Sequence, residues 1–234
     1  MSNMWPGWPA FSPSGAGEWI DLSHPLNANV DRVAFFPVPR FERVMHLATD
    51  RVNVTEIQMV CHFGTHIDAP CHFIPAAPAM HEIPLERLYG PGVVWHVPTP
   101  PYGLIDRETL ARRQPALRPG DILLLDTKSA EHFGTVRYTQ NPSLSPEAAE
   151  WLVTRGIKLL GLDCLTPDLA VDRRAPDFDW PIHHILLGHG VLIAENLTNL
   201  RALAGHRVEV MCCALNIEGA DGAPARVVAR RVDG

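Results

Sequence analysis

Residues 121–125 read Asp121-Ile122-Leu123-Leu124-Leu125, and this run decides the fold class together with the helix and strand signals after it. A short apolar run of this kind predicts a strand that is buried on both faces. The next signals predict a helix, which has Ser145 as its N-cap, proline at its first position and Gly156 at its end. After the helix, Ile157-Lys158-Leu159-Leu160-Gly161 predicts a second buried strand. This order predicts a βαβ-like unit and therefore an α/β protein.

The segments around this unit bring candidate functional residues to the ends of strands. The loop over residues 127–141 is long enough to reach a site. Val191 to Ala194 predicts another buried strand, which delivers Glu195 at its end. His183 is expected at or near the start of a short helix. Strand ends suit ligands, because the sheet fixes them while the neighbouring loops admit a substrate.

A dense cluster of chemically active residues lies upstream, where the chain reads Cys61-His62-Phe63-Gly64-Thr65-His66-Ile67-Asp68-Ala69-Pro70-Cys71-His72-Phe73. Imidazole nitrogen and carboxylate oxygen are ordinary ligands for zinc, manganese or iron(II). An imidazole also titrates close to neutral pH, so a further histidine in the cluster can shuttle protons. This cluster is the main reason to predict an enzyme.

The spacing of the cluster favours a strand over a helix. In a helix Asp68 would turn away from His62 and His66, whereas in a strand all three project to one side. A straight strand, however, would separate the Cα atoms of His62 and His66 by roughly 13 Å, which is too far for sharing one metal. We therefore expect the chain to bend near Gly64.

Residues 62–73 resemble the signature H-x-G-T-H-x-D-x-P-x-H-F of the cyclase family of metal-dependent hydrolases, which includes bacterial kynurenine formamidases and isatin hydrolases. The resemblance extends over most of the chain from about Trp19 onward. The matching segments are Asp21 to Leu26, Asn141 to Asp163, His183 to Leu200 and Gly219 to Arg226.

The resemblance implies a ligand set, residue by residue. His62, His66, Asp68 and Glu195 would hold one divalent metal. His183, twelve positions before Glu195, would join Asp68 and Glu195 around a second metal. His72 would be the general acid/base. Because these ligands supply only nitrogen and oxygen, both zinc and manganese are admissible, with one or two ions per subunit.

The resemblance also implies the architecture and the reaction. It implies a mixed, barrel-like sheet with helices packed outside in a single domain over residues 18–234, and a homodimer with its sites near the subunit interface. The expected activity is hydrolysis of a small-molecule amide bond by metal-activated water. N-formylkynurenine, an aryl formamide of the kynurenine pathway, is the leading substrate, and a cyclic amide such as isatin is the alternative. Residues 36–39 and 214–217 depart from the segments of dedicated kynurenine formamidases.

Three competing interpretations stay open at this point. A structural metal is one, although structural sites are usually closed and rich in cysteine. A metal-binding scaffold without turnover is another, but a scaffold has no use for an unliganded His72 beside its metal. His184 is an alternative to His183, since spacing alone does not exclude it. We interpret Cys61 and Cys71 as small buried hydrophobes, because neither belongs to a C-x-x-C pair.

Composition bounds the remaining possibilities. The chain of 234 residues is long enough for one sizeable domain, and 46% hydrophobic with 20% charged residues is ordinary for a soluble protein. A formal charge of −6 without a basic stripe argues against nucleic acid as a partner, and the longest apolar runs fall short of a membrane span.

Residues 1–17 lack the pattern of a secretory signal and are expected to form an irregular arm, with Trp5 and Trp8 packed on the body or on a second subunit. Five cysteines, an odd number, favour a reducing compartment, so we expect a cytoplasmic protein.

Overall fold

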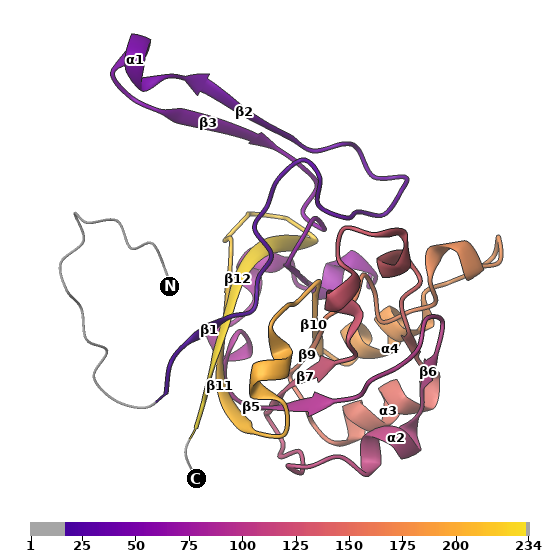
Figure 1. The fold of residues 1–234 in the computed structure, drawn as a ribbon. Helices are drawn as coiled ribbons and strands as arrows, with labels where there is room; N and C mark the ends of the chain where they lie inside the picture. The colour runs from indigo at the N-terminus through magenta and orange to yellow at the C-terminus, as the bar shows by residue number, and fades with distance from the viewer. Residues whose placement is uncertain (1–16, 233–234) are drawn as a thin grey trace.

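The main sheet has eight strands, which are β1 (Ile20–Asp21), β4 (His66–Asp68), β5 (Tyr89–His96), β7 (Ile122–Asp126), β9 (Leu159–Leu162), β10 (Leu192–Glu195), β11 (Arg207–Ala214) and β12 (Gly222–Arg231). Their order in the sheet is β1-β12-β11-β5-β7-β9-β10-β4, and β12 pairs again with β4. This last pairing closes all strands except β1 into a barrel (Figure 1). The computed structural model describes residues 17–232. The predicted mixed, barrel-like α/β fold is confirmed.

Parallel pairing links the strands that the sequence marks as buried. Strands β5, β7, β9 and β10 run parallel to one another, and the remaining pairings in the barrel are antiparallel. Helix α3 (Pro146–Thr154) connects β7 to β9, as the predicted βαβ unit requires. Its N-cap is Ser145, whose hydroxyl accepts a hydrogen bond from the Ala148 amide at 3.1 Å. Gly156 follows the helix with φ +70°, a conformation that favours glycine.

Side-chain alternation in the parallel strands separates two hydrophobic cores. In β7, Ile122 and Leu124 belong to a cluster that fills the barrel interior. Leu123 and Leu125 belong to a second cluster, which packs the outer face of the sheet against helices. Because successive side chains of a strand point to opposite faces, a central strand buried on both sides is continuously apolar. The sequence run that predicted the fold class thus serves both cores.

Helices α2 (Arg107–Ala111), α3 and α4 (Pro181–Gly188) form one layer outside the parallel strands (Figure 1). Asp106 caps α2 by accepting a hydrogen bond from the Thr109 amide at 2.8 Å. A small parallel pair, β6 (Leu104–Ile105) and β8 (Ser143–Leu144), lies beside this layer. The short 3-10 helices are Pro70–His72, Met80–Glu82, Leu85–Arg87, Ser129–His132, Val136–Thr139, Val171–Arg173 and Leu200–Leu203. The predicted location of helices outside the sheet is confirmed.

A two-stranded arm projects from the barrel (Figure 1). It consists of β2 (Arg40–Met45), the one-turn helix α1 (Leu47–Asp50) and β3 (Val54–Gln58), and its strands pair only with each other. Every residue of β3 is exposed. This two-stranded arm was not predicted from the sequence and is distinct from the irregular arm expected at residues 1–17.

Two further sequence predictions concern the N-terminal residues and the absence of a membrane span. Trp5, Trp8 and all but the last residue of the predicted N-terminal arm lie outside the described residues. Among the helices of the described part, none combines the length and apolarity that a bilayer crossing requires.

Candidate metal centre

The proposed ligands converge on the outer face of two paired strands. In β4, Ile67 points into the barrel core, so His66 and Asp68 project to the outside. In β10, Ala194 points inward, and Glu195 lies directly opposite His66 in the antiparallel pair. Helix α4 covers this place and contributes His183, which occupies its third position. Strand registry therefore assembles two segments that are more than a hundred residues apart.

The predicted bend occurs at Gly64. Gly64 has φ +63°, and an added Cβ would lie 2.3 Å from a Leu26 methyl group, so only glycine fits there. The bend is larger than the sequence suggested, because only His66–Asp68 form a strand and residues 61–65 are irregular. Gly222 of β12 provides the space for the displaced ring, since a Cβ there would lie 2.7 Å from His62 Cε1.

Asp68 and Glu195 each present their two carboxylate oxygens to different histidines. On one side, Asp68 Oδ1 lies 2.8 Å from His62 Nδ1 and 3.3 Å from His66 Nε2, and Glu195 Oε2 lies 3.4 Å from His66 Nε2. On the other side, His183 Nε2 lies 3.5 Å from Asp68 Oδ2 and 3.4 Å from Glu195 Oε1. Two carboxylates that divide their oxygens in this way form a pair of adjoining donor sets. Within residues 17–232, the groups of three ligating side chains all fall in this one region.

Several donor atoms in the cluster are buried without a hydrogen-bond partner. They include His66 Nε2, Asp68 Oδ2 and Glu195 Oε1. A buried polar atom without a partner costs about 1–3 kcal/mol, so such atoms are rarely grouped without reason. All three face the space between the two donor sets. The residues present therefore fit a divalent cation, which accepts these nitrogen and oxygen donors.

The electrostatics of the cluster are strongly negative. Burial alone would raise the pKa of the Asp68 carboxyl, but hydrogen bonds from His183, His62 and His66 hold that pKa well below its usual range. Burial would lower the pKa of His62, yet the carboxylates of Asp221 and Asp68 raise it to about 10. Burial and the nearby Asp68 raise the pKa of Glu195. Imidazoles with raised pKa values mark a potential that attracts cations.

Two of the three histidines proposed as ligands have a hydrogen-bond partner that fixes the ring, and the third lies beside a carboxylate. His66 Nδ1 lies 2.8 Å from the Gly64 carbonyl oxygen, and His183 Nδ1 lies 2.5 Å from Asp168 Oδ2. His62 Nε2 lies 3.0 Å from Asp221 Oδ2. Partners of this kind set which ring nitrogen faces a metal. The sequence analysis named neither Asp168 nor Asp221, because nothing in their local sequence distinguishes them from other aspartates.

His72 lies beside this cluster without belonging to either donor set. Its ring stacks on that of His62, with centroids 3.8 Å apart, and its Nδ1 lies 3.3 Å from Asp221 Oδ2. Burial lowers the pKa of His72 to about 4. The imidazole is therefore neutral near pH 7 and can accept a proton.

The other sequence candidates lie apart from the cluster. His184 points away from the donor sets, with its Nε2 3.6 Å from Asp179 Oδ1 at the surface. Cys61 and Cys71 are half-buried, so the interpretation of both as buried hydrophobes is only partly right. Burial raises the pKa of both thiols, which keeps them protonated. Neither cysteine belongs to a ligating group among the described residues.

A cleft opens from the cluster toward solvent, with aromatic walls. It is lined by Asp31, Arg32, Val33, Phe35, Phe36, Phe73, Leu165, Thr166, Arg174, Trp180 and Asn196, together with the histidines and carboxylates described above. None of residues 127–141 lines this cleft, but Tyr138 of that loop supports its wall by donating a hydrogen bond to Asn196 Oδ1 at 2.7 Å.

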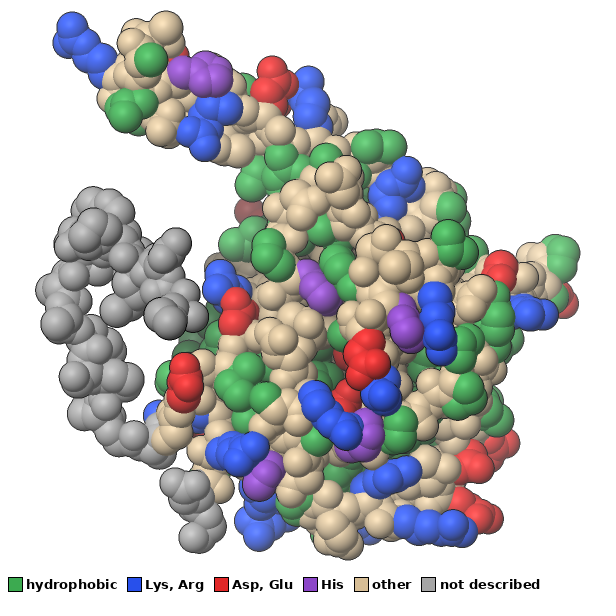
Figure 2. Space-filling model, viewed as in Figure 1, with side chains coloured by type: hydrophobic (Ala, Val, Ile, Leu, Met, Phe, Trp, Pro, Cys, Tyr) green, Lys and Arg blue, Asp and Glu red, His purple; other side chains and the backbone are tan. Residues whose placement is uncertain are grey.

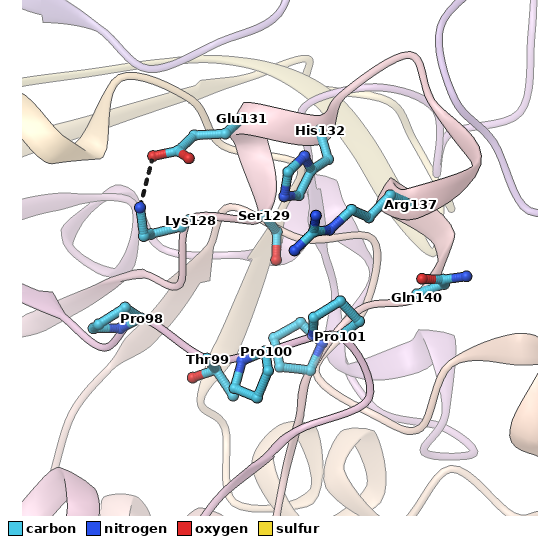
Figure 3. Close-up of a pocket in the computed structure, with 11 residues that line it drawn as sticks. Pro98, Thr99, Pro100, Pro101, Lys128, Ser129, Glu131, His132, Arg137 and Gln140 are labelled. Atoms are coloured by element: carbon cyan, nitrogen blue, oxygen red, sulfur yellow. Dashed lines mark ion pairs between the residues drawn. The ribbon is translucent and has the colours of Figure 1, made fainter.

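A larger hollow of about 340 Å³ lies elsewhere, at the carboxyl ends of β5 and β7. Ser129, His132 and Arg137 point toward its centre, and Lys128 pairs with Glu131 at 3.5 Å (Figure 3). It shares no lining residue with the cleft and contains no metal-ligating group among the described residues. Chemistry rather than size therefore identifies the cleft as the candidate active site.

Residues 20–169 match the model of the Cyclase family. This match covers well over half of the chain. The protein belongs to the Cyclase family. The family resemblance inferred from the sequence is confirmed.

Kynurenine formamidases and an isatin hydrolase are similar to the chain over most of its length. The chain is 33% identical to a kynurenine formamidase of Bordetella petrii, over 77% of this chain and 82% of the relative. It is 32% identical to a kynurenine formamidase of Bacillus cereus, over 92% of this chain and 98% of the relative. Isatin hydrolase A of Labrenzia aggregata, solved with benzyl benzoate bound, superimposes with a TM-score of 0.82 at 25% identity, over 94% of this chain and 96% of that structure.

Proposed function

We propose that this metal-dependent amide hydrolase cleaves the carbon–nitrogen bond of a small aryl formamide, with N-formylkynurenine as the leading substrate. The observation that carries the proposal is the division of the Asp68 and Glu195 oxygens between two sets of imidazoles, with the neutral His72 beside them. The kynurenine formamidases that match most of the chain support the choice of bond and substrate.

In this proposal the ligands are those named from the sequence. His62, His66, Asp68 and Glu195 hold one divalent ion, and His183 joins Asp68 and Glu195 around a second. The unpartnered buried atoms His66 Nε2, Asp68 Oδ2 and Glu195 Oε1 support this assignment. Zinc and manganese both suit a donor set made only of nitrogen and oxygen.

A divalent ion in such a site makes hydroxide available near neutral pH and polarises a carbonyl group. The side chains provide the proton transfers. His72 takes a proton from the attacking water, whose oxygen becomes bonded to the formyl carbon. The carbon–nitrogen bond then breaks, formate leaves with the water oxygen, and His72 returns the proton to the amine nitrogen. Asp221, 3.3 Å from His72 Nδ1, orients that ring.

A cyclic amide such as isatin is the second candidate substrate. The superposition on isatin hydrolase A supports it, since that likeness extends over nearly the entire chain. Opening a cyclic amide needs the same activated water and the same proton transfers. The products distinguish the two reactions, because only a formamide releases free formate.

We further propose a cytoplasmic homodimer in which the arm of each subunit contacts the other. Within the arm, the side chains of Leu47 and Ile57 are 62% and 54% exposed, as expected of residues that a second chain covers. Asp31, Arg32, Val33, Phe35 and Phe36 line the cleft, and the arm begins shortly after them at Arg40. Five cysteines that are all free in the structure support a reducing compartment.

The test of the reaction is hydrolysis of N-formyl-L-kynurenine by protein stripped of metal and then reloaded with zinc or manganese. We expect turnover that depends on the added metal, releases formate and is absent in His66→Ala. Metal binding without hydrolysis of either N-formyl-L-kynurenine or isatin would contradict the proposed function.

A further inference from the structure

A positively charged side chain lines the wall of the cleft. Arg174 lies between the 3-10 helix Val171–Arg173 and α4, and it is half-buried. Its guanidinium carbon lies 5.1 Å from the ring centre of Phe178 and 5.4 Å from that of Trp180. Its Nε donates a hydrogen bond to the Leu169 carbonyl oxygen at 2.8 Å. Stacking and this hydrogen bond hold the planar group in a defined place.

The terminal nitrogens of Arg174 have no carboxylate partner among residues 17–232. Acidic neighbours in the same segment are engaged elsewhere, since Asp172 accepts a hydrogen bond from the Tyr102 hydroxyl at 2.6 Å. Arg32, the other cation of the cleft, donates to three backbone carbonyls through its Nη1, at 2.8–3.3 Å. Among the described residues, Arg174 is therefore the cation of the cleft whose two terminal nitrogens both remain available to a ligand.

A continuous series of rings connects this guanidinium to the proposed metal centre. The Phe73 ring lies 4.6 Å from that of His183 and 5.9 Å from that of Trp180, on which Arg174 stacks. A flat aromatic molecule lying along Phe73 and Trp180 would have one end at the ligand cluster and the other at Arg174. Aromatic side chains favour this stacking geometry.

The backbone at Trp180 is strained in a way that keeps this wall in place. Trp180 has φ +41° and ψ +59°, the left-handed region that a bulky residue rarely adopts, directly before Pro181. A conformation of this kind costs about 1–3 kcal/mol and persists only where its surroundings impose it. In this conformation the indole lines the cleft, beside Arg174 and Phe73.

The solvation of Arg174 supports the same interpretation. Burial lowers the pKa of Arg174, while the negative charges of Asp168 and Glu195 oppose that shift. A half-buried charge without a fixed counter-ion is unfavourable until an anion reaches it. The guanidinium fork matches a carboxylate through two parallel hydrogen bonds.

We propose that Arg174 determines specificity by binding the carboxylate of an aromatic substrate that lies along Phe73 and Trp180. The inference rests on the proposed function and narrows it to aryl formamides that carry a carboxylate group, in preference to neutral amides such as isatin or N-formylaniline. N-formylkynurenine belongs to this narrower class.

The kinetic test compares 4-formamidobenzoate, whose carboxylate is at the opposite end of the ring from the formamide, with N-formylaniline, which has no carboxylate, on the metal-loaded enzyme. We expect Arg174→Gln to raise KM for 4-formamidobenzoate about 10- to 100-fold, the loss of a charge-assisted bidentate contact, and to leave KM and kcat for N-formylaniline within about twofold. Arg174→Lys should recover part of the affinity. Arg173→Gln is the matched control, because the neighbouring guanidinium stacks on Tyr102 and does not line the cleft. Equal effects of Arg174→Gln on both substrates, or no effect on either, would overturn the proposal.

A binding experiment separates this inference from the proposed reaction. Titration calorimetry of the metal-loaded enzyme with 4-aminobenzoate and with aniline requires no turnover. We expect 4-aminobenzoate to bind more tightly, and this preference to disappear in Arg174→Gln but not in Arg173→Gln. Binding of the carboxylate by the metal alone would leave the preference intact in both variants and would contradict the role of Arg174. If the preference depends on Arg174 but no formamide is hydrolysed, the proposed function fails and the carboxylate site stands.

Discussion

Two strands of five residues, β7 in the barrel and β3 in the arm, differ in almost everything that stabilises them. All residues of β7 are buried, and all residues of β3 are exposed. Strand β7 has a parallel neighbour on each side and supplies two hydrophobic cores. Strand β3 pairs with β2 alone. The barrel is therefore held by its own burial, whereas nothing within the described chain provides comparable burial to the arm.

Mostly local contacts hold the arm, apart from Phe41 at its base, whose ring centre lies 6.3 Å from that of Phe63 in the body. Arg40 pairs with Glu56 across the two strands at 2.7 Å, and Arg43 donates a hydrogen bond to the Thr55 hydroxyl at 3.1 Å. Exposed contacts of this kind contribute little, and an isolated two-stranded hairpin is marginal in water. Apolar side chains are visible on the arm among its charged ones (Figure 2). These features are expected of a segment that a second subunit covers.

The largest effect should come from the ligand cluster on the outer face of β4 and β10. Asp68→Asn removes a charge from the carboxylate shared by both donor sets, and we expect activity to fall at least about 10³-fold with loss of bound metal. Metal content by atomic absorption and initial rates measure the two losses. His184→Ala, next to a proposed ligand but turned away from the cluster, is the control and should retain activity within about twofold. Full metal content and activity in Asp68→Asn would refute the ligand assignment.

The next prediction compares how much β7 and β3 contribute to the free energy of unfolding. Leu124→Ala opens a cavity in the barrel interior, where Leu124 is fully buried, and should reduce the free energy of unfolding by about 2–5 kcal/mol. Thr55→Ala in β3 should change it by less than about 0.5 kcal/mol, because its side chain is exposed. Urea denaturation of both variants measures this difference. Equal losses would show that the arm contributes to the same cooperative unit as the barrel.

A third prediction sharpens the role of the arm itself. Ile57→Asp places a charge on the exposed apolar side of β3 and should convert the proposed dimer to a monomer, with the near-ultraviolet circular dichroism of the barrel retained. Light scattering coupled to size-exclusion chromatography measures the mass. Glu42→Lys, on the same arm but already charged, is the control. A dimeric Ile57→Asp variant would place the subunit contact elsewhere.

The smallest effect concerns the segment that leads from β1 toward the arm. His24 stacks on Phe133 with ring centroids 3.6 Å apart, and burial lowers the pKa of His24 to about 4, below the value of 6.5 of the unfolded chain. The unfolded state therefore binds more protons between these pH values, so stability present above pH 6.5 is lost as the pH falls toward 4. Between about pH 7 and pH 5, we expect the Tm of the wild type to fall more than the Tm of His24→Phe. The difference between the two decreases should be roughly 2–4 °C. Parallel Tm curves would contradict a neutral, buried His24.

Features that depend on a few adjacent residues could be predicted from the sequence. Alternation put His66 and Asp68 on one face, Gly64 marked the bend, and Ser145 and Gly156 bounded a helix. These features depend on the backbone preferences of a few adjacent residues. The family resemblance then supplied His72, His183 and Glu195, which the structure brings close together. Their roles as base and ligands stay predictions until metal binding is measured.

Contacts between distant segments became known only from the fold. The pairing of β12 with β4 closes the barrel and brings Asp221 to His62, and a turn of the chain brings Asp168 to His183. Arg174 became notable only through Phe178 and Trp180 around it. The arm escaped prediction because its strands have no buried face, so their side chains lack the alternation that reveals a strand. Pairing partners and burial depend on which surfaces meet in space, and a single sequence read locally does not contain that information.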